Sequence, residues 1–147
     1  MKIENINCQA TSDKTVTIPD ADKNIILYFY PKDATPGCTT EGQDFRDNFA
    51  EFEENNCIIY GVSKDDMVKH EKFKAKQSFP FELISDESGE LCEVFGVWQL
   101  KQFMGKEYMG IVRSTFVISP TGEVLKSWDK VKVKGHIDEV LEFIKSL

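Results

Sequence analysis

The chain has 147 residues, of which 41% are hydrophobic and 12% aromatic, and its formal net charge is −7. This length suits one compact domain over residues 1–147 with a full core, and it is too short for two ordinary domains. The negative charge argues against nucleic acid or an anionic membrane surface as a partner. No apolar run approaches the ~18 residues of a membrane span, and the first residues lack the apolar stretch of a signal peptide, so the cytoplasm is the expected location.

The four cysteines, Cys8, Cys38, Cys57 and Cys92, form no C-x-x-C pair and have no histidine at a zinc-ligand spacing. A metal site is therefore not expected. In a chain of this size without an export signal, we expect reduced thiols that are either buried or chemically reactive.

Hydrophobic periodicity predicts the first elements of the chain. A weak alternation predicts a short edge strand over residues 15–18. The continuous apolar run over residues 24–30 is typical of a strand that is buried on both faces. Phe45, Phe49 and Phe52 recur at spacings of three and four, which predicts a helix from Cys38 to about residue 55.

The remaining elements alternate between strands and helices. The predicted strands cover residues 57–63 and 81–85, with a hairpin of residues 111–118 and 123–128 around a turn-rich connection. The predicted helices cover residues 65–77, 88–95 and 137–144. This order predicts a layered α/β domain with a central mixed sheet that is flanked by helices.

Cys38 stands where a buried strand gives way to a helix. Two turn formers, Pro36 and Gly37, precede it directly, so Cys38 is expected in the first turn of the helix. The free N–H groups and the partial positive charge of a helix N-terminus favour a thiolate over a thiol, and the thiolate is the nucleophilic form. Cys38 is therefore the candidate nucleophile.

Three residues are candidate partners of this thiol. Chemistry in open α/β sheets collects beyond the carboxyl ends of strands, and the loop there carries Pro31 and Thr35. The Thr35 hydroxyl can exchange a hydrogen bond with an oxygen held near the sulfur, and the Pro31 ring can shield the pocket from water. Arg113 is a cation inside an otherwise apolar predicted strand. Placed beside this loop, its guanidinium would stabilise a thiolate and bind a small polar substrate.

The pattern Pro31-x-x-x-Thr35-x-x-Cys38, with the distant Arg113, resembles the peroxidatic signature of the peroxiredoxins. Further segments resemble the bacterioferritin comigratory protein, or peroxiredoxin Q, subgroup, and they follow in order from about residue 15: residues 28–33, 35–39, 45–47, 85–86, 95–98 and 103–106. The resemblance implies a thioredoxin-like fold. It also implies reduction of hydrogen peroxide and organic hydroperoxides, without a metal, haem or flavin cofactor.

The resemblance also implies a role for each site residue. The Cys38 thiolate attacks a peroxide oxygen, releases water or alcohol, and becomes a sulfenic acid. Thr35 and the first N–H groups of the helix orient the peroxide, and Arg113 stabilises the thiolate and the leaving oxygen. Glu41 stands where the family usually braces this arginine, and its alternative interpretation is a helix-dipole or surface carboxylate.

The chain departs from the subgroup at the second, resolving cysteine. The two usual positions hold Gln43 and Lys74. Cys57 should lie roughly 25 Å from Cys38, beyond a helix of ~16 residues, and Cys92 is interpreted as a small buried hydrophobe. Cys8, in a polar and mobile N-terminal segment, stays open as an alternative resolver. The preferred hypothesis is a one-cysteine enzyme whose sulfenic acid is resolved by an external thiol, from thioredoxin, glutaredoxin or glutathione.

Other conspicuous residues receive structural interpretations. His70 and His136, in polar helical surroundings, are expected at the surface without a role. An aromatic cluster is expected to form a wall of the pocket or a dimer surface; it consists of Trp98, Phe103, Met104 and Tyr108. Lys32 and Asp33, a charged pair in the loop that precedes Cys38, are expected to be solvated.

Two functions stay open at this point. The first is a thiol peroxidase. The alternative is a peroxide-sensing or redox-signalling module of the same fold, in which oxidised Cys38 is resolved slowly and serves as the signal. A disulfide reductase of the thioredoxin type is not favoured, because Cys38 has no C-x-x-C partner. A monomer or a weak homodimer is expected, and the sequence specifies neither the physiological reductant nor the preferred hydroperoxide.

Overall fold

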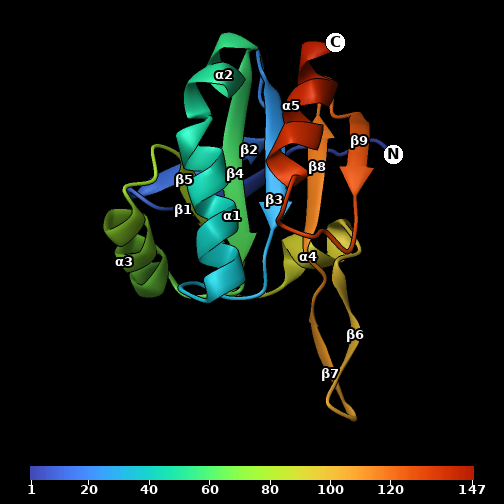
Figure 1. Cartoon of the computed structure of the whole chain (residues 1–147). Helices are drawn as coiled ribbons and strands as arrows, with labels where there is room; N and C mark the ends of the chain where they lie inside the picture. The colour runs from blue at the N-terminus through green and yellow to red at the C-terminus, as the bar shows by residue number, and fades with distance from the viewer.

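The computed structural model describes residues 1–147, with five helices and nine strands (Figure 1). The strands of the central sheet are β1 (Ile6–Ala10), β2 (Lys14–Ile18), β3 (Asn24–Phe29), β4 (Cys57–Ser63), β5 (Glu82–Ser85), β8 (Ser114–Ile118) and β9 (Val124–Trp128). A separate hairpin consists of β6 (Trp98–Phe103) and β7 (Lys106–Ile111). The helices are α1 (Pro36–Asp47), α2 (Phe49–Glu54), α3 (Met67–Gln77), α4 (Glu90–Val94) and α5 (His136–Lys145). None of these helices is long and apolar enough to cross a membrane.

The central sheet has the strand order β2-β1-β5-β4-β3-β8-β9. Strands β3, β4 and β5 run parallel, and the other pairings are antiparallel, so the predicted mixed sheet is confirmed. The parallel strands end at the same edge, and the loops that follow β3 and β4 lead into α1 and α3 there. This edge is where α/β folds place their chemistry.

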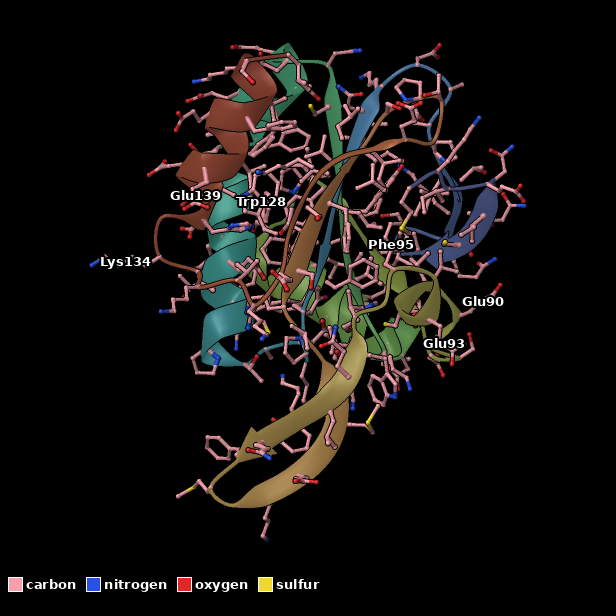
Figure 2. All side chains as sticks on the ribbon, turned by 90° about the vertical axis from the view of Figure 1, so that its right-hand side faces the viewer. Glu90, Glu93, Phe95, Trp128, Lys134 and Glu139 are labelled. Carbon is pink, nitrogen blue, oxygen red and sulfur yellow. The ribbon has the colours of Figure 1, made fainter.

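The sheet separates two apolar cores of 17 buried residues each. Successive side chains of β3 point to opposite faces, so Leu27 and Phe29 belong to one core while Ile26 and Tyr28 belong to the other. Helices α1, α2 and α5 cover the second face, in front of the sheet in Figure 1. Figure 2 shows α4 on the other side, where Phe95 points inward and the two glutamates of the helix point to solvent.

Several predicted elements differ from the structure, and the hairpin of β6 and β7 was not predicted. The helix expected from Cys38 to about residue 55 is interrupted at Asn48, which separates α1 from α2. Strand β1 was not predicted, and Cys8 lies buried within it rather than in a mobile segment. Arg113 lies between β7 and β8 and not inside a strand.

The hairpin of β6 and β7 projects from the body of the protein, as both figures show. Trp98 at its base is half-buried, with the Lys64 ammonium 4.0 Å from its ring centroid. Phe103 and Met104 near the tip are 66% and 87% exposed, and Tyr108 is also exposed. The exposure of Phe103, Met104 and Tyr108 contradicts a packed aromatic wall of these residues, and the dimer surface stays a prediction.

Both histidines are buried, which overturns the expectation that they lie at the surface. His70 and His136 face inward from α3 and α5, and each ring has hydrogen-bond partners inside the protein. Their polar sequence neighbours occupy the solvent-facing sides of the same helices. Asp33 is also buried, so Lys32 alone of that pair is solvated.

Close packing of α1 depends on Gly42. A methyl group there would contact the Phe79 ring, with Cε1 at 2.9 Å, and this ring is itself held between Phe73 and Phe81. We expect Gly42→Ala to lower the free energy of unfolding by about 1–3 kcal/mol, measured by urea denaturation. Phe79→Leu should recover part of this loss in the double variant, and a Gly42→Ala protein as stable as wild type would contradict the packing.

Candidate active site

The loop after β3 delivers Cys38 to the first turn of α1, as predicted. Pro36 begins the helix and Thr35 is its N-cap residue. A proline is well suited to the first helical position because its missing N–H needs no partner there. The N–H groups of the next residues have no partners within the helix, and Cys38, in this first turn, is buried at 2% exposure.

Arg113 reaches this thiol because of strand pairing. Strand β8 is antiparallel to β3, and Ser114 pairs with Phe29, so the residue before β8 lies beside the loop that follows β3. The guanidinium Nη2 donates a hydrogen bond to the Cys38 sulfur at 3.3 Å. Its Nη1 donates to Oε1 of Glu41 at 2.6 Å. One planar cation thus joins a thiol and a carboxylate.

Glu41 is a buried partner of the arginine and not a surface carboxylate. Its side chain is 2% exposed, and burial raises its pKa to about 7 although Arg113 acts in the opposite direction. Burial by itself lowers the pKa of Arg113, but the charges of Glu41 and Cys38 raise it above its ordinary value. The guanidinium is therefore a permanent positive charge at the sulfur.

Burial and the charge of Arg113 lower the pKa of two further basic residues, and the sequence indicated neither of them as part of the site. Lys101, on β6, donates from Nζ to the carbonyl oxygen of Ile111 at 2.9 Å, and burial together with Arg113 lowers its pKa. His136 is hydrogen-bonded through Nε2 to Thr115, and burial together with Arg113 lowers its pKa to about 4. Both residues come from elements that approach the site only in the folded chain.

The other predicted loop residues lie close by. The Thr35 hydroxyl donates to the carbonyl oxygen of Lys32 at 2.8 Å, so its oxygen lone pairs stay available as acceptors. Pro31 is exposed at the surface of the same loop, and shielding of the sulfur by its ring stays a prediction. Gly37 was identified from the sequence only as a turn former, yet a Cβ there would stand 3.2 Å from Nη2 of Arg113. A glycine therefore allows the guanidinium to approach the helix.

The three other cysteines lie far from Cys38 in the architecture. Cys57 pairs with Asn24 at the start of β3, whereas Cys38 follows the opposite end of that strand. Cys8 and Cys92 belong to the core on the other face of the sheet. Burial raises the pKa of Cys8 and of Cys57 to about 11, so both are thiols at neutral pH.

The two usual resolver positions are occupied by residues with other partners. Gln43 donates from Nε2 to Oε1 of Gln77 at 2.9 Å and so links α1 to α3. Lys74 forms an ion pair with Glu82 at 3.3 Å. Neither side chain offers sulfur chemistry, and both contribute to packing around α3.

One cluster has the donor atoms for a metal ion. Asp33, Asp65 and His70 bring one ligand atom each within 4.8 Å of one another. However, Oδ2 of Asp33 and Nδ1 of His70 are 2.6 Å apart, which is a hydrogen-bond distance. The cluster is therefore fully accounted for by hydrogen bonding.

A buried thiol held by a guanidinium, at the carboxyl edge of a mixed sheet, defines a cysteine-dependent redox protein. The sequence pattern of the AhpC/TSA family matches residues 1–127. Peroxiredoxin Bcp of Bacillus subtilis is 49% identical over 147 residues, which cover 99% of this chain and 94% of the relative. Peroxiredoxin Bcp of Xanthomonas campestris is 50% identical over 122 residues, which cover 83% of this chain and 76% of the relative.

Solved structures agree with these relatives. Peroxiredoxin Q of Xanthomonas campestris superposes with a TM-score of 0.91 at 44% identity, over 96% of this chain and 90% of that one. A cysteine-to-serine mutant of Xylella fastidiosa peroxiredoxin Q gives a TM-score of 0.94 at 38% identity, over 99% and 94%. The chain therefore belongs to the AhpC/TSA family, in its Bcp or peroxiredoxin Q group, and has the thioredoxin-like peroxiredoxin fold.

The raised pKa of Glu41 predicts a pH-dependent stability. Between its ordinary value of 4.5 and about 7, the folded protein keeps a proton that the unfolded chain releases. The free energy of unfolding from this group should therefore fall as the pH rises through this window, by at most about 1.4 kcal/mol per pH unit.

Glu41→Gln removes the titration, so wild type should lose stability relative to this variant as the pH rises from about 4.5 to about 7. Urea denaturation at several pH values measures the difference. The lowered pKa of His136 has the opposite effect, since it reduces the free energy of unfolding as the pH falls. This contribution cancels in the comparison because both proteins contain His136. A difference that stays constant over this range would show that Glu41 is ionised throughout.

Proposed function

We propose that the protein is a peroxidase that reduces hydrogen peroxide and organic hydroperoxides through Cys38. The observation that carries this proposal is the Arg113 fork, with one arm 3.3 Å from the Cys38 sulfur and the other on Glu41. Family membership supports the same reaction. One set of structures concerns the alkyl peroxide reduction activity of the Xanthomonas campestris bacterioferritin comigratory protein, which favours organic hydroperoxides among the substrates.

The chemistry follows from the charges at the site. The Cys38 thiolate attacks the terminal peroxide oxygen, the S–O bond forms as the O–O bond breaks, and the leaving oxygen takes up a proton to become water or alcohol. Arg113 stabilises the thiolate before attack and the negative charge on the departing oxygen during it. The lone pairs of the Thr35 hydroxyl accept a hydrogen bond from the peroxide, and the free N–H groups of the α1 N-terminus donate to it.

An external thiol closes the cycle in this proposal. It attacks the sulfenic sulfur of Cys38, releases water and leaves a mixed disulfide, which a second thiol then reduces. Support comes from the positions of the other thiols: Cys8 and Cys92 lie in the opposite core, and Cys57 lies at the far end of β3 from Cys38. Thioredoxin, glutaredoxin or glutathione could supply the thiol, and the cytoplasm holds such thiols reduced. Resolution by Cys8 is the alternative, and it requires β1 to leave the sheet.

Turnover separates the peroxidase from a peroxide sensor. We expect wild type to consume many equivalents of hydrogen peroxide or an alkyl hydroperoxide with at least one reductant of a panel of thioredoxin, glutaredoxin with glutathione, and glutathione alone. Cys38→Ser is the blank, and Arg113→Lys, which keeps a charge but not the fork, should slow oxidation of Cys38 at least ~10-fold. Oxidation that stops after one equivalent with every reductant would favour the sensor.

Mass spectrometry after one equivalent of peroxide, without added reductant, tests the resolving step. The expected product is Cys38 sulfenic acid, trapped with dimedone, because no other thiol lies near it. A prompt disulfide that contains Cys38 in wild type, and that is lost in Cys8→Ser, would overturn external resolution and establish Cys8 as the resolver. Cys57→Ser serves as the matched control, since Cys57 lies at the opposite end of β3.

A further inference from the structure

One histidine lies completely buried behind the active loop, which comprises residues 31–35 between β3 and α1. The side chain of His70 on α3 is 0% exposed, and that of its partner Asp33, in the loop, is 5% exposed. The ring nitrogen Nδ1 is 2.6 Å from Oδ2 of Asp33, and Nε2 is 2.9 Å from the carbonyl oxygen of Ile84. The ring therefore joins α3 to the end of β5 and to the loop that carries the nucleophile.

The two contacts of His70 fix how many protons the pair holds. The carbonyl oxygen of Ile84 can only accept, so Nε2 must carry a hydrogen. If Nδ1 had none and Asp33 were ionised, two lone pairs would face each other at 2.6 Å between buried side chains. One proton must therefore lie between Nδ1 and Oδ2, on either the imidazole or the carboxyl group, and the pair as a whole is neutral.

Asp33 is anchored through both carboxyl oxygens and through its backbone. Its Oδ1 accepts from the Tyr30 hydroxyl at 2.6 Å, and its own N–H donates to Oδ2 of Asp65 at 2.8 Å. The same Asp65 oxygen accepts from the Ser63 hydroxyl at 2.6 Å. Residues from the ends of β3 and β4 and from α3 thus converge on a single residue of the active loop.

The loop needs such anchors because of its backbone conformation. Ala34, directly after Asp33, has a φ of +63°, which is left-handed and costs a residue with a Cβ roughly 1–2 kcal/mol. The chain then turns extended at Thr35 and enters α1 at Pro36. The placement of the α1 N-terminus, and of Cys38 against Arg113, depends on this turn being held.

We propose that His70 and Asp33 form a positioning pair, which holds the active loop so that Cys38 is presented to Arg113 and to the peroxide. His70 acts through Asp33 and makes no hydrogen bond to the sulfur or to the arginine. The proposal rests on the proposed function, because its effect is on the reaction of Cys38. The hydrogen-bond geometry at Asp33, and not the charge of Asp33, determines the rate of Cys38 oxidation.

The experiment compares single-turnover oxidation of Cys38 by excess hydrogen peroxide, quenched and quantified by mass spectrometry, in variants whose folding is verified by circular dichroism. His70→Ala and Asp33→Ala should slow oxidation at least ~10-fold, because displacements of about 1 Å suffice for such losses. Asp33→Asn should stay within about 3-fold of wild type, since its amide can donate to a neutral His70 and accept from Tyr30. Ile144→Ala, a core truncation at the far end of α5, controls for lost stability and should keep the wild-type rate.

Two outcomes would overturn the proposal. A His70→Ala protein that melts at a lower temperature but oxidises at the wild-type rate would assign the pair to stability alone. An Asp33→Asn rate as low as that of Asp33→Ala would show that charge, and not hydrogen-bond geometry, governs the loop.

A second measurement decides the matter if the alanine variants do not fold. Proton NMR of wild type should show a low-field resonance from the Nδ1–Oδ2 bridge that is absent in Asp33→Asn, where Nδ1 becomes an acceptor. A wild-type spectrum without this resonance would remove the basis of the proposal. If wild-type Cys38 reacts with peroxide no faster than a free cysteine, the proposed function fails, while the NMR comparison and the rate of Cys38 alkylation by iodoacetamide in the same variants still test the pair.

Discussion

The contact on which the site depends is the fork of Arg113 between the Cys38 sulfur and the Glu41 carboxylate. An isolated buried carboxylate would be costly, and so would an isolated buried guanidinium. Here the charges of Glu41 and Arg113 offset each other's cost of burial. The Nη2 group of the arginine then donates to the Cys38 sulfur. The arrangement requires three separate features: the antiparallel pairing of β8 with β3, a helical turn between Cys38 and Glu41, and a glycine at position 37.

The two-faced sheet explains why the thiols have different chemistry. Cys38 lies on the face covered by α1 and α5, beside a cation, whereas Cys8 and Cys92 lie in the opposite core, where burial raises the pKa of each thiol. A side chain cannot pass from one face to the other without breaking the sheet. The sheet therefore separates the nucleophile from Cys8 and Cys92, while Cys57 shares its face but lies at the opposite end of β3. This separation is the physical basis for proposing that an external molecule completes the cycle.

The sequence predicted the elements whose signals are local. The apolar run before Pro31 and the turn formers before Cys38 located the strand, the loop and the helix start, and Arg113 stood out as a cation among apolar residues. The hairpin of β6 and β7 gave no such signal, because its side chains are mostly exposed and no alternation marks a buried face. Burial of His70 was missed for a related reason: its partners Asp33 and Ile84 are 37 and 14 residues away, and no local pattern records them.

Two polar networks hold the nucleophile from opposite sides of the same loop. Arg113 and Glu41 fix the sulfur from the β8 side, and His70 with Asp33 fixes the entry to the helix from the α3 side. The left-handed backbone of Ala34 directly follows Asp33 in this loop and is held by that anchor. Networks of this kind contribute little net stability but select one geometry among several. A thiol that must meet a small peroxide beside a fixed cation requires that selection, because a displacement of about 1 Å in the reacting groups is enough to slow the reaction strongly.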